Sequence, residues 1–198
     1  MNKVVFIDMG HSSVTPGKCS PDKTFREWDF THRLGRAIIW KLNELGVDAR
    51  PTTSTEEDDV EVSLTTRANR ANAVAKQIGS SNVLFVSIHS NAAGNKGWMK
   101  ARGWSVYIAK SCSSATKKLA NCLFDAAVNR GFKTRKPSPN QKYWTENFTV
   151  LTKTCCPAVL TESLFYDNKE DLAILKSEEG FDRLLQMHVD GIMKFLQG

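Results

Sequence analysis

The stretch NVLFVSIH, residues 82–89, decides how the chain folds. It is a continuous apolar run rich in β-branched and aromatic residues, which is typical of a strand buried on both faces of a parallel sheet. The run ends in His89, a side chain that can bind a metal. A buried strand that ends in such a residue makes the ends of the other strands candidate positions for a site.

Strand and helix patterns alternate along the rest of the chain. Further strands are predicted at residues 3–8, 47–51, 104–109 and 158–163. Amphipathic or alanine-rich helices are predicted at residues 25–45, 64–78, 114–130 and 178–196. Residues 132–148 are basic and polar, contain two prolines, and are predicted to form a surface loop. The alternation predicts an α/β fold: a single domain with a twisted, mostly parallel sheet of about five to six strands and helices on both faces.

The composition limits the classes of partner. The 198 residues suit one domain, and a hydrophobic content of 41% is enough for a substantial core. The formal net charge of +6 favours an anionic partner. The basic residues are scattered and form no helix-turn-helix, zinc-finger or RNA-binding motif, so we expect no nucleic acid as partner.

The sequence gives no sign of export or of a membrane span. The N-terminal apolar run is short and interrupted by Asp8, unlike a signal peptide. No apolar run approaches the roughly 20 residues of a transmembrane helix. We therefore expect a protein made in the cytoplasm. The five cysteines include no Cys-x-x-Cys, which argues against a structural zinc cluster, and we expect them to be reduced and mostly buried.

Polar side chains that can bind a metal lie at the ends of several predicted strands. His11 comes shortly after the first strand, His89 ends the third, and Glu162 lies at the end of the last. Glu27 lies in the first turn of the helix that comes after the first strand. Ligands of open α/β sheets bind beyond the carboxyl ends of the strands, so we expect these four side chains to lie close together.

Two histidines and a carboxylate with one open position are a known arrangement for catalytic zinc. Zinc lowers the pKa of water to about 7, and a carboxylate that does not bind the metal can accept the proton. His11, Glu27 and His89 are the candidate ligands, and Glu162 is the candidate base. Spacing alone leaves the alternative open that either histidine is an ordinary turn residue, because no short His-Glu-x-x-His signature is present.

Five segments resemble those of a known family. In chain order they are FIDMGHSS (6–13), RANRANAV (67–74), VLFVSIHSNAA (83–93), ARGWSVYIA (101–109) and FTVLTKTCCPAVLTESLFYDNKED (148–171). Together they resemble the zinc-dependent N-acetylmuramoyl-L-alanine amidases of the amidase-3 type. The resemblance runs from about residue 3 to the C-terminus, so we expect residues 1–198 to form one catalytic domain, with no separate wall-binding domain evident.

The resemblance implies zinc at His11, Glu27 and His89, with Glu162 as the catalytic carboxylate. The family hydrolyses the amide between N-acetylmuramic acid and the L-alanine of peptidoglycan stem peptides. It thus implies Zn²⁺ as cofactor and peptidoglycan as substrate, and we expect a monomer. Without a visible signal peptide, action on the cell wall suits a phage or prophage endolysin, or a host enzyme exported by another route.

Other functions stay open as alternatives. A catalytically inactive, peptidoglycan-binding protein of the same fold is one, although all four expected site residues are present. A related zinc carboxypeptidase is another, because similar ligands serve there. A cysteine nucleophile near Glu162, such as Cys156, has no evident base in the sequence around it.

The chain departs from the family pattern in three places. Ser12 and Ser13 come after the first histidine, where the family has two glycines. Ser163 begins the stretch Ser-Leu-Phe after the catalytic glutamate, where the family often has Gly-Phe, so Phe165 is the expected equivalent aromatic. ARPTTSTEEDD (49–59) replaces the usual Thr-Arg…Asp. These changes concern substrate detail more than catalysis.

Several polar residues are predicted to support the site or the fold. Asp8 is expected to support His11 as a hydrogen-bond acceptor, and Arg67 to form an intramolecular ion pair. His32 lies off the apolar stripe of its helix and is expected at the surface. His188 is expected in the core or at a cap.

Aromatic and basic residues allow two interpretations each. Trp98 and Trp104 either line the cleft or pack inside the protein. The basic loop either touches an anionic polymer or is solvated; its members are Lys133, Arg135, Lys136, Lys142, Tyr143 and Trp144.

Overall fold

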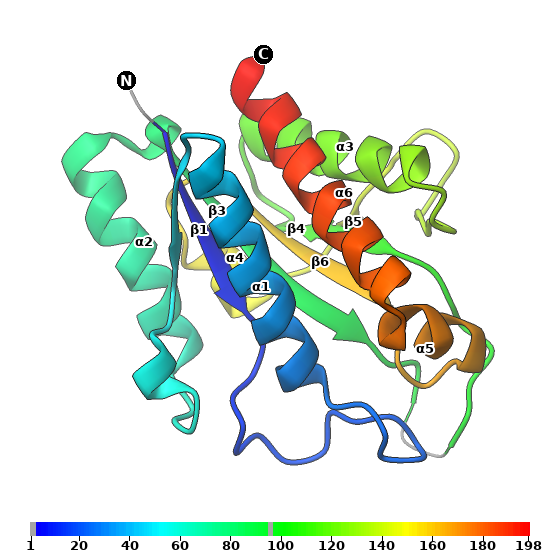
Figure 1. The fold of residues 1–198 in the computed structure, drawn as a ribbon. Helices are drawn as coiled ribbons and strands as arrows, with labels where there is room; N and C mark the ends of the chain where they lie inside the picture. Colours follow the sequence, from blue (N-terminus) through cyan, green and yellow to red (C-terminus); the bar gives the residue numbers. More distant parts are fainter. Residues whose placement is uncertain (1–2, 95–96) are drawn as a thin grey trace.

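A mixed sheet of six strands forms the centre of the molecule (Figure 1). The computed structural model describes residues 3–94 and 97–198. The strands lie in the order β2-β1-β3-β6-β4-β5. Their bounds are β1 Val4–Met9, β2 Asp48–Pro51, β3 Val83–Asn91, β4 Ser105–Ile108, β5 Trp144–Thr145 and β6 Ala158–Phe165. β4 runs antiparallel to β6, and the other described pairings are parallel, which confirms the predicted mostly parallel α/β sheet.

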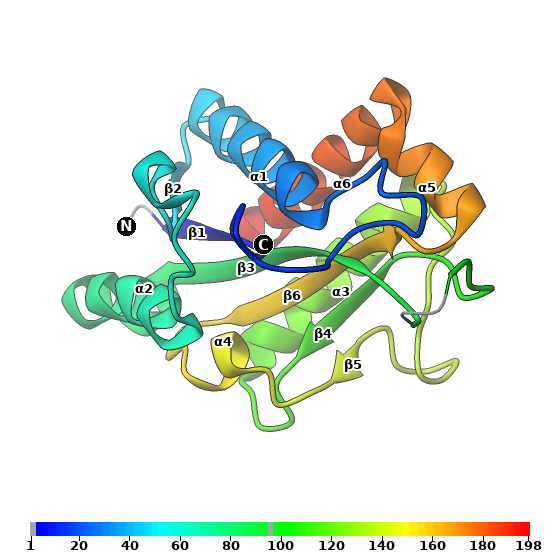
Figure 2. The same cartoon turned by 90° about the horizontal axis from the view of Figure 1, so that it is seen from below.

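Helices cover both faces of this sheet. Their bounds are α1 Glu27–Glu44, α2 Leu64–Ile78, α3 Ser114–Asn129, α4 Thr149–Thr152, α5 Lys169–Lys176 and α6 Glu178–Gln197. Figure 2 shows α1 and α6 on one side of the sheet and α2 and α4 on the other. Each side has its own apolar core: α1, α3 and α6 pack over one, and α2 and α4 over the other. No helix in the described parts of the chain is long and apolar enough to cross a membrane.

The alternation of side chains along the strands decides on which face the site lies. Phe85 of β3 and Leu160 of β6 belong to the core under α2 and α4. His89 and Glu162 lie four and two residues further along their strands, so they point to the same face. The two residues are also partners in the parallel register of β3 and β6. The sheet itself therefore places the imidazole beside the carboxylate.

The segment after β6 contains a helix that the sequence patterns did not predict. Asn168 caps α5, because its Oδ1 accepts hydrogen bonds from the backbone N–H groups of Glu170 and Asp171, both at 3.1 Å. The buried carboxylate of Asp171 accepts from the N–H groups of Gly103 at 2.6 Å and Phe165 at 3.1 Å. Asp171 thus ties the end of β6 to the start of β4. β5 and α4 were likewise not predicted, since both are very short.

Candidate metal centre

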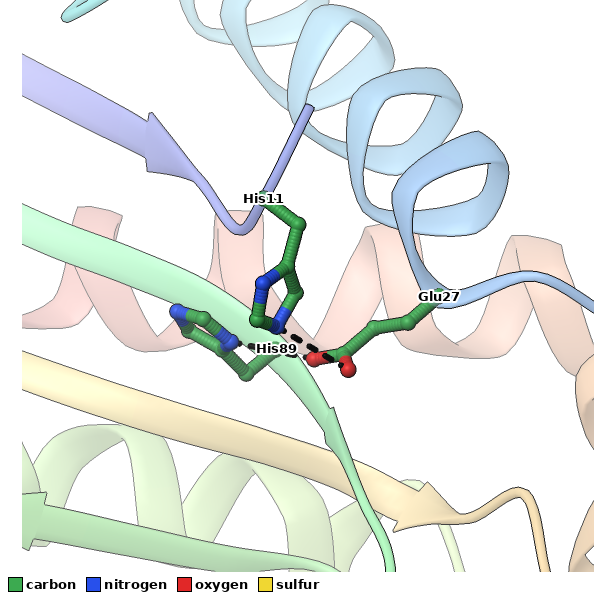
Figure 3. A group of neighbouring side chains, drawn as sticks. All are labelled: His11, Glu27 and His89. Carbon is green, nitrogen blue, oxygen red and sulfur yellow. Dashed lines mark hydrogen bonds and ion pairs between the residues drawn. The ribbon is translucent and has the colours of Figure 1, made fainter. Parts of the chain in front are cut away.

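His11 lies just after β1 in an unusual backbone conformation. Its φ is 68°, in the left-handed region that residues with a Cβ rarely adopt. The preceding residue is fixed on both sides: Gly10 donates its N–H to the carbonyl of Ile88 at 3.0 Å and accepts from the Thr31 hydroxyl at 2.8 Å. The turn therefore sends the His11 side chain sideways, over the end of the neighbouring strand β3 (Figure 3).

Glu27 opens α1 and reaches back to both histidines. Its N–H donates to the Lys18 carbonyl at 2.8 Å, which satisfies one free donor at the start of the helix. Its Oε2 lies 3.1 Å from His11 Nε2, and its Oε1 lies 3.0 Å from His89 Nδ1 (Figure 3). The backbone N–H of Ser90 donates to the same Oε1 at 3.1 Å. Burial opposes ionisation of Glu27, but the hydrogen bonds from the two histidines outweigh it and hold the pKa at about 2.

These three side chains fit a divalent metal such as zinc. One ligand atom from each of His11, Glu27 and His89 lies within 4.8 Å of the others. Among the described residues, these three side chains form the group that is close enough to share one metal ion. Imidazole nitrogen and carboxylate oxygen are donors that zinc accepts. The backbone leaves room for this cluster only because residue 10 is glycine. A Cβ on Gly10 would lie 2.5 Å from Cε1 of the His89 ring.

Glu162 lies beside the cluster without taking part in it. It is half-buried, and its Oε2 atom is shielded from solvent with no hydrogen-bond partner among the described residues. Burial raises the pKa of this carboxyl to about 8, while the positive charges of His89 and Lys18 oppose the shift. Glu162 is thus a carboxyl group that can hold a proton near neutral pH next to three possible metal ligands.

A cavity of about 480 Å³ opens over these four residues. Its walls add residues that sequence reasoning missed: Lys18, Glu61, Leu64, Asn147, Phe148 and Tyr166. Tyr166 lies directly after β6, so the rule that ligands bind at strand ends could have found it. Burial raises the pKa of its phenol, which stays protonated as a hydrogen-bond donor. Asn147 and Phe148 come from the loop before α4, and no local pattern places that loop at the site.

Comparison with known proteins agrees with this geometry. The family model for N-acetylmuramoyl-L-alanine amidases matches residues 5–194. The chain belongs to this family. Zinc-dependent hydrolysis of the amide between N-acetylmuramic acid and the L-alanine of peptidoglycan is the activity of these amidases, so the activity and the cofactor predicted from the five segments are confirmed.

Individual amidases and relatives match over nearly the whole chain. The endolysin of Bacillus phage SPP1 is 32% identical over 99% of this chain, and the match covers 67% of the endolysin. The N-acetylmuramoyl-L-alanine amidase CwlM of Bacillus licheniformis is 28% identical over 96% of this chain and 67% of its own length. The catalytic domain of CwlV, an amidase from Bacillus (Paenibacillus) polymyxa, superposes with a TM-score of 0.80 at 28% identity, covering 98% of both chains.

Asp8 supports the amidase site differently from the prediction. No hydrogen bond joins it to His11 in the described structure; instead it accepts from the hydroxyls of Thr52 at 2.6 Å and Ser87 at 2.7 Å, and from Arg67 Nη1 at 3.2 Å. The buried Arg67 also donates to the carbonyls of Met9 at 2.5 Å and His11 at 3.2 Å. The predicted ion pair of Arg67 is confirmed, and Asp8 reaches the His11 backbone only through it.

The prediction that His32 lies at the surface is wrong. Its side chain is only 3% exposed, because the loop between β2 and α2 covers that side of α1. The ring bonds to Asp58 and to the His11 carbonyl. His188 lies in the core as predicted, with Nδ1 2.8 Å from the Leu184 carbonyl.

The serines that replace the family's glycines are tied down by side-chain and backbone bonds. Ser12 is buried and donates its hydroxyl to Glu61 at 3.0 Å, and Thr15 bonds to the same carboxylate oxygen. Ser13 donates its N–H to the Asp58 carbonyl at 2.8 Å. A glycine at position 12 could not make the link to Glu61. The loop beside the site is therefore bound to Asp58 and Glu61. Asp58 belongs to the segment 49–59, which also departs from the family pattern.

The other predictions about aromatic and basic residues are now decided in part. Trp104 is buried and packs inside the protein, while Trp98 is exposed and does not line the cavity. Phe165 is buried as well, so the aromatic residue of the cavity after Glu162 is Tyr166. In the basic loop, Lys142 forms an ion pair with Asp125 at 2.5 Å.

The cysteines are free, as predicted, but most of them are not buried. Cys122 and Cys156 are buried and Cys155 is exposed. Burial raises the pKa of the Cys156 thiol to about 12, which makes it a poor nucleophile. Cys155 and Cys156 line a second cavity, which shares no residue with the one over Glu162.

Proposed function

We propose that this chain cleaves the amide between N-acetylmuramic acid and L-alanine with His11, Glu27 and His89 as zinc ligands and Glu162 as general acid and base. The observation that carries this assignment is the position of Glu162. It is the register partner of His89, points into the same cavity, and keeps one carboxylate oxygen free of any described partner. The residue that should exchange protons is the one that the fold leaves unpaired.

The four residues have two separate roles: three bind the metal, and Glu162 transfers protons. Zinc bound to the three ligands would act as a Lewis acid toward the carbonyl and lower the pKa of water. Glu27 stays ionised because both histidines bond to it, so it can act as a ligand over a wide pH range. The Glu162 carboxylate takes the proton from the attacking water and returns it to the nitrogen of the leaving L-alanine. A carboxyl group with a pKa near neutral is suited to both steps.

The similarity to a phage endolysin supports a role in cell-wall lysis. We infer that the 198 residues act as one catalytic domain, working as a monomer on peptidoglycan and not on nucleic acid. All four residues of the assigned site come from a single chain and line one cavity, which supports a monomeric active unit. The setting is the cell wall, reached by release from a phage-infected cell or by another export route.

Digestion of purified peptidoglycan tests this proposal. Metal-loaded protein should release stem peptides with a new N-terminal L-alanine, and a chelator should stop the release until zinc is added back. Glu162→Gln should lower kcat by about 10²–10⁴-fold while the protein still binds zinc. Glu44→Gln, an exposed glutamate at the end of α1, is the matched control and should cut like the parent.

Each alternative gives a different result in the same assay. A wall-binding pseudo-enzyme would sediment with peptidoglycan and release no peptide. A zinc carboxypeptidase would release C-terminal residues without creating N-terminal alanine. If Glu162→Gln cuts as fast as the parent, the assignment of the general base is wrong.

A further inference from the structure

The backbone of His11 needs support from outside its own turn. The left-handed conformation is disfavoured for any residue with a Cβ, so neighbouring groups must hold it. The His11 carbonyl accepts two hydrogen bonds, from Arg67 Nη2 at 3.2 Å and from His32 Nε2 at 3.2 Å. The His11 carbonyl and the Asp58 carboxylate both only accept, so the His32 ring makes both hydrogen bonds when each of its nitrogens carries a proton. These two donors set the direction of the peptide after His11.

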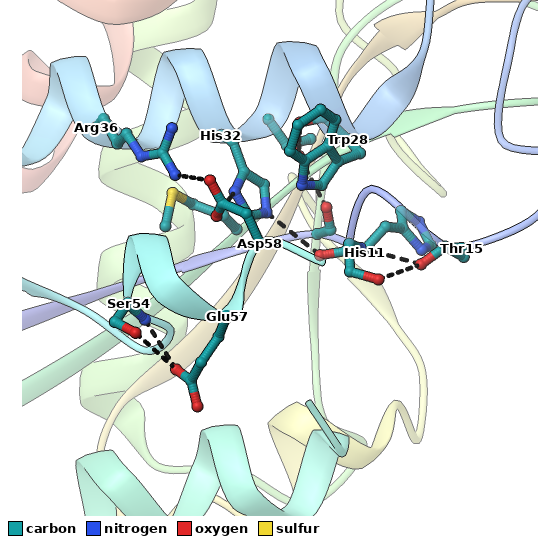
Figure 4. A network of polar contacts seen from close by, with 12 residues as sticks. His11, Thr15, Trp28, His32, Arg36, Ser54, Glu57 and Asp58 are labelled. Carbon is teal, nitrogen blue, oxygen red and sulfur yellow. Dashed lines mark hydrogen bonds and ion pairs between the residues drawn. The ribbon is translucent and has the colours of Figure 1, made fainter. Parts of the chain in front are cut away.

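The ring of His32 is itself held in place (Figure 4). Its Nδ1 lies 3.0 Å from Asp58 Oδ1, and the other carboxylate oxygen of Asp58 bonds to Arg36 one turn further along α1. The Trp28 ring lies against it, with the centroids 5.3 Å apart. His32 therefore has fixed partners on both ring nitrogens and on one face.

Asp58 acts on the His11 turn from two directions. Its carboxylate orients His32, which donates to the His11 carbonyl, and its own carbonyl accepts the N–H of Ser13 at 2.8 Å. Asp58 thus holds both Ser13 and, through His32, the peptide group of His11. The loop that contains Asp58 therefore helps to fix the backbone from which the His11 side chain reaches Glu27.

We propose that His32, oriented by Asp58, is a positioning residue for the metal ligand His11. It acts through the ligand's backbone carbonyl, in contrast to the usual outer partner of a metal-binding histidine, which bonds the second ring nitrogen. The inference rests on the proposed role of His11 as a zinc ligand. His32 is a better probe of this function than Arg67, because Arg67 also neutralises the buried Asp8 and its loss would damage the core.

Two substitutions at position 32 separate the two contacts of the ring. In His32→Gln the amide nitrogen lies near the position of Nε2, so the bond to the His11 carbonyl is kept and the one to Asp58 is lost. In His32→Asn the shorter amide reaches only the position of Nδ1, so the bond to Asp58 is kept and the one to His11 is lost. Both variants remain polar amides. Asn has about the helix propensity of His and Gln a slightly higher one, so neither variant is expected to weaken α1 through propensity.

The readouts are zinc affinity, measured by competition with a chromophoric chelator, and the visible spectrum of the cobalt-substituted protein. We expect His32→Asn to bind zinc about 10–100-fold more weakly than the parent and to shift the cobalt bands. His32→Gln should stay within about threefold of the parent. Urea unfolding of the metal-free variants reports whether either change acts through stability alone.

The parent and His11→Ala are measured first, so that the two proposals can fail separately. If His11→Ala binds zinc like the parent, the metal site itself is wrong. If His11→Ala loses zinc but His32→Asn binds it as tightly as the parent, the positioning role is wrong. Equal losses in His32→Asn and His32→Gln that parallel their losses in stability would likewise show that His32 only supports the fold.

Discussion

The two flanks of the cavity treat their polar groups in opposite ways. On the flank built from β1, α1 and α2, Asp8 accepts from three side chains and Glu27 from two histidines and one backbone N–H. On the β6 flank, Glu162 Oε2 is buried without a partner in the described part of the chain. Partners hold a group still and fix its charge, whereas a missing partner leaves a group free to exchange a proton.

The largest loss of stability is expected when the buried ion pair of the first flank is removed. Arg67→Met leaves Asp8 buried and without its cation, so the free energy of unfolding should fall by about 3–5 kcal/mol. Urea unfolding of the metal-free protein measures it. Arg50→Met is the matched control, because Arg50 pairs with Asp48 at the surface and its loss should cost less than about 1 kcal/mol. Equal losses in the two variants would contradict the importance of the buried pair.

On the unpaired flank, removing a charge should stabilise the fold. Burial raises the pKa of Glu162 from 4.5 to about 8. Between these values the folded state keeps a proton that the unfolded state releases, so the stability of the metal-free parent falls as pH rises through this window. Glu162→Gln lacks that loss and should be more stable than the parent above about pH 8, by up to a few kcal/mol, since one pKa unit corresponds to about 1.4 kcal/mol.

Urea unfolding at acidic and alkaline pH checks this difference. The advantage of Glu162→Gln should be small near pH 4.5 and reach its full size above pH 8. Glu27 should show the opposite pH dependence of stability. Its pKa is about 2, so its contribution to the free energy of unfolding is present above pH 4.5 and is lost as the pH falls toward 2. An advantage of Glu162→Gln that does not change with pH would show that the unpaired carboxyl is not the cause.

A smaller effect is expected between the two flanks, at Gly10. In Gly10→Ala the new methyl group would lie 2.5 Å from the His89 ring, which must move away from Glu27. Zinc affinity should fall about tenfold, as measured by chelator competition. Gly94→Ala is the control, because its methyl group would meet mainly the flexible end of Met99. Unchanged zinc affinity in Gly10→Ala would show that His89 has more freedom than its packing indicates.

The smallest effect is expected away from both flanks. Cys155 is exposed and lines a cavity separate from the one over Glu162. Cys155→Ser should therefore leave kcat/KM on muropeptides within about twofold of the parent. A large loss of activity would instead show that the second cavity takes part in the reaction.

The sequence predicted the long elements well because their signals are local. The apolar run ending at His89 and the amphipathic stripes of α1 and α6 appear in the fold close to their predicted bounds. Short elements were missed: α5 depends on a cap by Asn168 and on contacts of Asp171 with distant backbone groups. The four expected site residues lie together, and their individual roles stay predictions until the variants are measured.

By itself the sequence determined which side chains reach the carboxyl end of the sheet, since strand ends and a two-residue alternation are properties of consecutive residues. Only the tertiary structure decided how those side chains are held. Three contacts join segments more than 20 residues apart in the sequence. They are the bonds of His32 to Asp58, of Arg67 to Asp8 and of Ser12 to Glu61. No local pattern encodes such contacts, because they depend on how two loops pack against one another once the sheet has formed.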